Sequence, residues 1–218
     1  MPIKAVIFDF DLTLADSSQG VYQCMNHALK KLGYPPADFQ TIKRTIGYTL
    51  PESFRILSGS MDEESAKSFV EEYVSYADLV MNQSTIVFPE VFSVLPILRS
   101  QNLRTVIVST KYRYRIEEIL KRDSLVPFFD LIIGGEDVTK HKPDPEGLFR
   151  AIDSLGLDNA DVLFVGDSLV DLTAAKNAKV DFCAVLTGAT TKDEFTTSNS
   201  VHIIENLEGL INILSRTE

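Results

Sequence analysis

The chain has 218 residues, of which 44% are hydrophobic and 24% are charged, the usual balance of a folded globular protein. A formal net charge of -10 makes it a poor candidate for binding nucleic acid or an anionic membrane surface. No apolar stretch has the length of a membrane span, and the first residues turn acidic too early for a signal peptide. We therefore expect a cytoplasmic protein, in which Cys183, within an apolar run, is a buried reduced thiol.

Short apolar segments rich in β-branched residues predict the buried strands of a parallel sheet. These segments are residues 3–8, 104–109, 131–133, 162–165, 182–186 and, more weakly, 201–204. Helical patterns lie between most of them, at residues 91–98, 112–120, 144–155, 169–178 and 207–214. Asp144 and Pro145 suit the start of the third helix, and Gly156 suits its end. Strands that alternate with helices predict an α/β fold with a Rossmann-like parallel sheet covered on both faces.

The alternation of strands and helices fails directly after the first strand. Residues 15–88 contain no good strand pattern and carry helical patterns at residues 17–31, 37–46, 52–57 and 62–80. A crossover between parallel strands rarely needs so much chain. The sequence thus predicts a catalytic core of residues 1–14 and 89–218, with an inserted α-helical cap domain at residues 15–88. We expect the cap to open and close about hinges near residues 15–16 and 87–89.

Polar residues follow the predicted strands, and ligands of open α/β sheets bind beyond the carboxyl ends of the strands. Asp9 and Asp11 follow the first strand and are two residues apart, so both can face one pocket. Such a pair suits Mg²⁺, or a nucleophile with a neighbouring acid and base. Two solvated loop acids would show the same spacing.

The next two predicted strands are followed by groups suited to a phosphate. Ser109 and Thr110 can bind a phosphate oxygen, or they can cap the helix that follows. Lys142 precedes a rigid Pro-containing helix start, where it can offer a fixed positive charge or lie solvated on the surface.

The fourth predicted strand is followed by Gly166, Asp167 and Asp171. The two acids are four residues apart and lie near one face of a helix, although acids in a first helical turn also act as caps. Because these groups and the earlier ones meet at one edge of the sheet, the combination favours a phosphoryl-transfer site.

These segments together resemble the four motifs of the haloacid dehalogenase superfamily, and specifically of its phosphatases. Asp9-Phe10-Asp11-Leu12-Thr13 resembles the first motif, in which Leu12 stands where many relatives have Gly. Ser109-Thr110 resembles the second motif and Lys142-Pro143 the third. Gly166-Asp167-Ser168, together with Asp171, resembles the fourth. The helical insertion resembles the small cap domain of that family, so the likeness covers nearly the whole chain.

The resemblance implies a role for each matching residue and Mg²⁺ as the cofactor. Asp9 would form an aspartyl-phosphate, and Asp11 would protonate the leaving oxygen and later deprotonate water. The metal would be held by Asp9, the backbone carbonyl of Asp11, and Asp167, with Asp171 in support. Lys142, Thr13, Ser109 and Thr110 would hold the phosphoryl group.

Members with such a cap include phosphoglycolate phosphatases, β-phosphoglucomutases, pyrophosphatases, nucleotidases and phosphonatases. We expect a phosphatase of the phosphoglycolate type acting on a small phosphorylated substrate as a monomer or homodimer, with a phosphomutase as the alternative. A phosphonatase needs a cap lysine, for which Lys30, Lys31 and Lys43 are the candidates. Arg44 either binds a second anionic group of the substrate or lies on the cap surface. A non-catalytic protein is disfavoured because both Asp9 and Asp11 are present.

Overall fold

The computed structural model describes residues 3–196 and 201–215 and contains a six-stranded sheet of order β5-β4-β1-β6-β7-β8. All five strand pairs are parallel. The strands are β1 (Ala5–Phe8), β4 (Arg104–Val108), β5 (Leu131–Ile133), β6 (Val162–Gly166), β7 (Asp181–Val185) and β8 (Val201–Ile204). The predicted α/β fold is therefore confirmed, and the strand ends differ by no more than two residues from the expected ones.

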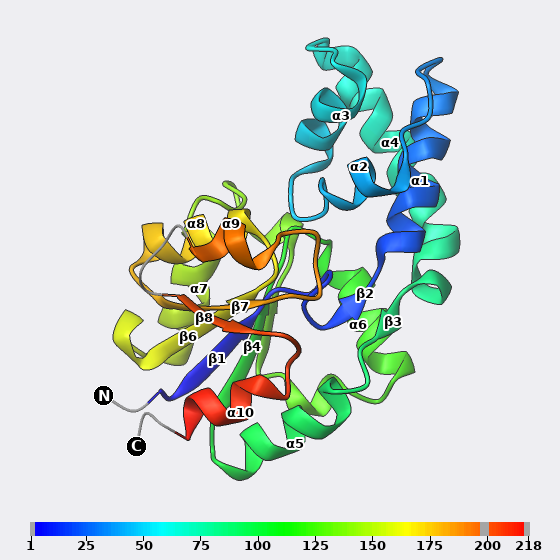
Figure 1. Cartoon of the computed structure of the whole chain (residues 1–218). Helices are drawn as coiled ribbons and strands as arrows, with labels where there is room; N and C mark the ends of the chain where they lie inside the picture. The colour runs from blue at the N-terminus through cyan, green and yellow to red at the C-terminus, as the bar shows by residue number, and fades with distance from the viewer. Residues whose placement is uncertain (1–2, 197–200, 216–218) are drawn as a thin grey trace.

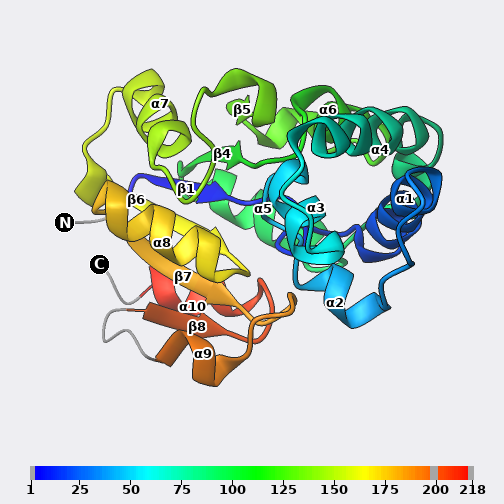
Figure 2. The same ribbon diagram turned by 90° about the horizontal axis from the view of Figure 1, so that it is seen from above.

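Helices cover both faces of this sheet (Figures 1 and 2). On one face lie α5 (Val91–Ser100), α6 (Arg113–Arg122) and α10 (Gly209–Leu214). On the other lie α7 (Glu146–Leu155), α8 (Leu169–Ala178) and the short α9 (Lys192–Thr196), which was not predicted. Val6 and Phe8 of β1 enter the first cluster and Ala5 and Ile7 the second, because successive side chains of a strand point to opposite faces.

Three single-turn 3₁₀ helices connect elements of the sheet region. They are η1 (Val126–Phe128), η2 (Gly135–Asp137) and η3 (Asn159–Asp161). Such short segments leave no periodic pattern in a sequence, which explains why they were not predicted.

A separate group of helices stands beside the sheet (Figure 1). It consists of α1 (Ser18–Lys31), α2 (Phe39–Lys43), α3 (Leu50–Ser58) and α4 (Glu63–Ser84). Two short strands, β2 (Ala15–Asp16) and β3 (Ile86–Val87), pair antiparallel where the chain enters and leaves this group. The expectation that residues 15–88 hold no strand is wrong at these two points, because two-residue strands are too short to show alternation.

The helical group has its own hydrophobic cluster, which includes Phe54 of α3 and Phe69 of α4. The ring centroids of Phe54 and Phe69 lie 5.2 Å apart. The helix expected from residue 52 begins earlier, at Leu50, because Thr49 and Glu52 form a capping box and Pro51 fits the first turn. Among the helices of the described residues, none is both long and apolar enough to cross a membrane.

The position of β1 decides where the functional residues meet. Its neighbours are β4 on one side and β6 on the other, so the order of the strands reverses at β1. The carboxyl end of β1 therefore lies at the topological switch point, where ligands of such sheets bind. Residues that follow β1, β4 and β6 come together at this edge.

Candidate active site

Asp9 follows β1 directly and lies at the centre of this edge. Its backbone N–H donates to the carbonyl of Val165 at 2.9 Å, which continues the pairing of β1 with β6. The residue is only 2% exposed. Its Oδ1 accepts a hydrogen bond from the Phe10 N–H at 2.7 Å and lies 3.0 Å from the Nζ of Lys142. This carboxylate is thus held by the backbone and by a buried ammonium group.

The other two polar residues of the same loop are held by partners from later in the chain. Both carboxylate oxygens of Asp11 contact the Nζ of Lys111, at 2.9 and 3.2 Å. The Thr13 hydroxyl donates to Oδ1 of Asp167 at 3.3 Å. The loop therefore connects to the chain after β4 and to the chain after β6.

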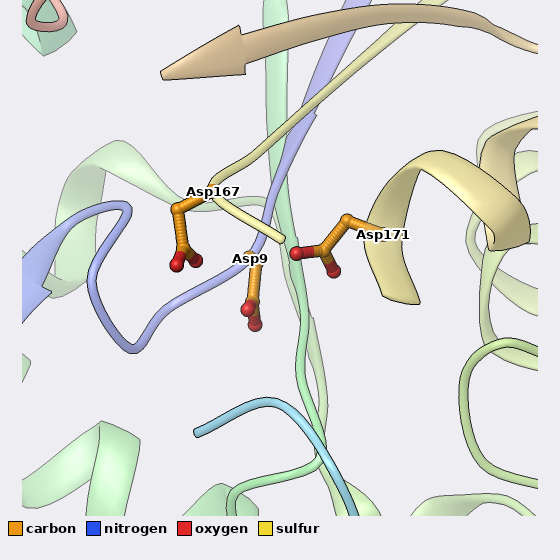
Figure 3. Close-up of side chains that lie close together, drawn as sticks. All are labelled: Asp9, Asp167 and Asp171. Carbon is orange, nitrogen blue, oxygen red and sulfur yellow. The ribbon is translucent and has the colours of Figure 1, made fainter. Parts of the chain in front are cut away.

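Three buried carboxylates gather at the edge of the sheet (Figure 3). Asp9, Asp167 and Asp171 each offer an oxygen within 4.8 Å of those of the other two. Lys142 contacts Asp171 at 2.5 Å and Asp9 at 3.0 Å, and it is itself 5% exposed. One ammonium against three carboxylates leaves an excess of negative charge in a buried place. Oxygen ligands with this charge fit a divalent cation such as Mg²⁺.

Two glycines allow these acids to approach the backbone. A Cβ on Gly166 would lie 2.6 Å from the Cβ of Asp171. A Cβ on Gly188, in the loop after β7, would lie 2.0 Å from Oδ2 of Asp167. Since real Cβ atoms do not approach so closely, only glycine fits at these two positions.

Asp171 combines the two roles that the sequence left as alternatives. Its backbone N–H donates to the Ser168 hydroxyl, and its carboxylate accepts from the Ser168 N–H at 3.2 Å, so it completes the capping box of α8. Its Oδ1 faces Lys142. Capping therefore orients the carboxylate that positions the lysine.

Burial shifts the pKa values of this cluster. Burial, opposed by Lys142 and reinforced by Asp171 and Asp11, raises the pKa of Asp9 to about 6. The pKa of Asp167 is raised well above its ordinary value by burial and by Asp171 and Asp9. For Lys142, burial alone would lower the pKa, but the attraction of Asp171 and Asp9 outweighs it and the pKa is raised. The lysine is therefore charged, and it is not a solvated surface residue.

Ser109 and Thr110 follow β4, and neither caps the next helix. The N-cap of α6 is Tyr112, without a side-chain cap, and the first helical N–H, that of Arg113, donates to the carboxylate of Glu136. The capping alternative is therefore wrong, because a capping side chain belongs to the N-cap residue, and Ser109 and Thr110 both precede Tyr112 by at least two residues. Ser109 is 6% exposed, and its hydrogen bond to Asp9 acts to lower the pKa of that acid.

A pocket opens beside Asp11 between the helical group and the sheet. It encloses about 520 Å³ of space, part of which is open to solvent. The lining residues come from the loops after β1 and β4, from α1, the α2–α3 loop, the start of α3, α4, and the start of α6. They are Asp11, Val21, Met25, Thr45, Ile46, Gly47, Tyr48, Leu50, Tyr73, Thr110, Lys111, Tyr112 and Arg115.

Arg115 and Lys111 are the positively charged residues among those that line this pocket. Arg115 also links the sheet region to α4, since its Nη2 donates to the Val74 carbonyl at 2.9 Å and to Asp78 at 2.7 Å. Sequence reasoning missed Arg115 and Tyr73 because a helical pattern does not tell which residue faces a distant segment. Lys111 was not among the predicted site residues, although its position shortly after a strand was a usable signal.

Arg44 does not line this pocket. Its side chain is 60% exposed and forms an ion pair with Glu194 at 3.2 Å. It lines a neighbouring cleft, which also includes Asp167 and shares Tyr48 with the first pocket. Hydrogen bonds from Thr191, together with Arg44, lower the pKa of Glu194 to about 2. The structure thus brings Asp9, Asp11, Thr13 and Lys142 of the predicted site together with the other core residues, and places Arg44 in the neighbouring cleft on the side of Asp167.

Comparisons with known proteins agree with this geometry. Residues 6–185 match the family model described as haloacid dehalogenase-like hydrolase. The chain is 31% identical over 94% of its length to a Dickeya dadantii protein named "Probable phosphatase IndB", of which 91% is covered. It is 30% identical to a plasmid-encoded phosphoglycolate phosphatase of Cupriavidus necator, with 99% of this chain and 94% of that protein covered.

Among solved structures, a haloacid dehalogenase-like hydrolase from Bacteroides fragilis superposes with a TM-score of 0.93. The identity is 47%, and 95% of this chain and 99% of that chain are covered. The chain belongs to the haloacid dehalogenase-like hydrolase family. Because its relatives in that family are named phosphatases, the chain is a phosphatase. Phosphatases of this superfamily use a divalent metal, which the cluster of Asp9, Asp167 and Asp171 fits.

We predict that replacing Asp167 by Asn stabilises the metal-free protein at neutral pH. The pKa values of Asp167 and Asp9 are raised in the folded state, so folding is favoured by protonation. The free energy of unfolding contributed by these groups falls as pH rises above about 4 and through the raised pKa of each group, which for Asp9 is about 6. We expect a gain on the order of 1–3 kcal/mol at pH 7.5 that shrinks toward pH 5, measured by thermal unfolding in EDTA.

Asp181→Asn is the matched control, because this aspartate is exposed at the start of β7. An equal gain from that substitution would contradict the explanation. Added Mg²⁺ should raise the melting temperature of the wild type more than that of Asp167→Asn.

Proposed function

We propose that this chain is a Mg²⁺-dependent phosphatase that hydrolyses small phosphate monoesters through an aspartyl-phosphate on Asp9. The observation that carries the proposal is the position of Asp9, buried at the end of the central strand between a lysine and two further carboxylates. Mg²⁺ held by Asp9, the backbone carbonyl of Asp11, and Asp167 would neutralise charge on the phosphoryl group.

In the first step an oxygen of Asp9 attacks phosphorus, the bond between phosphorus and the leaving oxygen breaks, and Asp11 gives that oxygen a proton. Lys111, at 2.9 Å, holds the Asp11 carboxylate beside the pocket in which the leaving group would lie. In the second step Asp11 takes a proton from water, the water oxygen bonds to phosphorus, and the bond to Asp9 breaks to release phosphate.

Positive charge and hydroxyl groups would hold the phosphoryl oxygens. Lys142 lies 3.0 Å from Asp9, and Ser109 lies within hydrogen-bond reach of the same carboxylate, so both are beside the attacking atom. Thr13 and Thr110 are further candidates for contact with the phosphoryl group. Asp171 would act on the reaction by fixing Lys142.

The pocket beside Asp11 supports a phosphoglycolate-like substrate. We assign the second anionic group of such a substrate to Lys111 and Arg115, in place of the Arg44 expected from the sequence. Of the lysines considered for a phosphonatase, Lys30 and Lys31 do not line this pocket. Lys43 does not line it either, but lies in the neighbouring cleft, where its Nζ donates to the Gly188 carbonyl. The pocket beside Asp11 therefore lacks the lysine that a phosphonatase needs.

We propose that residues 15–88 form a cap that moves on a core of residues 1–14 and 89–218. The paired strands β2 and β3 would serve as the hinge. In this structure polar contacts join the two parts at both sides of the cleft. Lys43 donates to the Gly188 carbonyl at 3.3 Å on one side, and Arg115 pairs with Asp78 on the other.

Replacing Asp9 by Asn should reduce phosphate release to background, because the nucleophile is lost. We would measure phosphate from p-nitrophenyl phosphate, phosphoglycolate, pyrophosphate, sugar phosphates and nucleoside monophosphates, with and without Mg²⁺. Metal removal by EDTA should stop turnover, and added Mg²⁺ should restore it. A wild type that releases phosphate from none of these compounds would refute the proposal, and conversion of a sugar phosphate with a bisphosphate primer would then indicate the mutase.

Replacing Arg115 by Met should raise the KM for phosphoglycolate about 10- to 100-fold, as expected for a lost charge-assisted hydrogen bond. The KM for p-nitrophenyl phosphate, whose leaving group is uncharged in the ester, should change by less than about threefold on the same grounds.

Arg122→Met is the matched control, because Arg122 also joins α6 to the end of α4, through the Thr85 carbonyl at 3.0 Å, but does not line the pocket. If both variants impaired the two substrates equally, Arg115 would be a structural link and not a substrate contact.

A further inference from the structure

Leu12 has an unusual backbone conformation in the loop that follows β1. Its φ of 60° lies in the left-handed region, which costs free energy for a residue with a branched side chain. Its side chain is nevertheless only 1% exposed. A buried leucine in a strained conformation persists only where the surroundings hold it there.

The Leu12 side chain belongs to the hydrophobic cluster of the helical group. Among the described residues, the other buried members of this cluster all lie between Val21 and Met81. Phe10 and Leu14, the next apolar residues on either side, belong instead to the cluster of the sheet. One short loop is therefore anchored in two separate hydrophobic clusters.

Hydrogen bonds hold the Leu12 backbone from both sides. Its N–H donates to the Ala15 carbonyl at 2.7 Å. Its carbonyl accepts from the hydroxyl of Thr187, in the loop after β7, at 2.5 Å. Because the Leu12 N–H and C=O are both hydrogen-bonded, the Leu12 side chain cannot shift without turning the backbone on either side. Such a turn moves the neighbouring residues Asp11 and Thr13.

We infer that Leu12 is a positioning residue that couples the place of the helical group to the orientation of Asp11. When the helical group packs against the loop as in this structure, the Leu12 side chain lies in the hydrophobic cluster of that group, and Asp11 lines the pocket proposed for the leaving group. When the group moves away, the strained loop relaxes and Asp11 turns from that position. The inference rests on the proposed function, in which Asp11 supplies the proton.

The kinetic test compares two leaving groups. A p-nitrophenolate leaves without a proton, whereas the alkoxide of phosphoglycolate needs one, so only the second depends strongly on the acid. Because Asp11 also serves the second step, which is the same for both substrates, the comparison uses the rate constant of the first step, the formation of the aspartyl-phosphate, measured by rapid quench in a single turnover. Leu12→Ala and Leu12→Gly should lower this rate constant for phosphoglycolate by about 10- to 100-fold, within the usual contribution of a general acid. The rate constant of the first step for p-nitrophenyl phosphate should fall by less than about threefold, and Leu12→Met should keep both near the wild-type values.

Phe54→Leu is the control, since Phe54 belongs to the same cluster but lies on α3, which Figure 1 shows at the end of the helical group away from the sheet. It should lower the melting temperature without changing the ratio of the two rate constants for the first step. An equal loss on both substrates in the Leu12 variants, or the same ratio change in Phe54→Leu, would overturn the inference.

Hydrogen exchange gives a readout that needs no substrate. The N–H of Leu14 donates to the Phe10 carbonyl at 2.9 Å, so its exchange reports on the loop. We expect faster exchange of residues 9–16 in Leu12→Ala and not in Phe54→Leu. Unchanged exchange in Leu12→Ala would contradict the coupling, whereas a wild type without phosphatase activity would refute the proposed function alone.

Discussion

The site depends on several like charges held close together in a buried place. Asp9, Asp167 and Asp171 would repel one another strongly at this edge of the sheet, and the ammonium of Lys142 offsets only part of the repulsion. Packing, glycines and the capping box of α8 hold the carboxylates together. The folded protein therefore stores an electrostatic repulsion that a bound divalent cation would relieve.

The surrounding fold explains how such a cluster can be built. β1 lies between β4 and β6, so the segments that follow all three strands converge without long loops. The acids sit on these rigid strand ends and helix starts, and Gly166 and Gly188 provide the space for their close approach. The helical group supplies the other wall of the pocket, whereas the carboxylates of the cluster all come from segments that follow strands of the sheet.

Leu12 and Arg115 link the two parts of the molecule by different kinds of contact. Leu12 carries an apolar side chain from the sheet into the helical cluster, and Arg115 reaches from α6 to the carbonyl of Val74 on α4. Leu12 is also the neighbour of Asp11, which lines the pocket, and Arg115 lines the pocket itself. The helical group and the loop that carries Asp11 are thus joined by direct contacts.

The sequence by itself determined the parallel sheet and the convergence of Asp9, Ser109, Lys142 and Asp167, because these follow from short-range patterns and from the rule for strand ends. It did not reveal β2, β3 or α9, which are too short to be periodic. Only the tertiary structure decided that Arg44 faces Glu194, that Arg115 lines the pocket, and that Leu12 enters the helical cluster. These contacts join segments far apart in the chain, and their partners depend on how the helical group packs against the sheet.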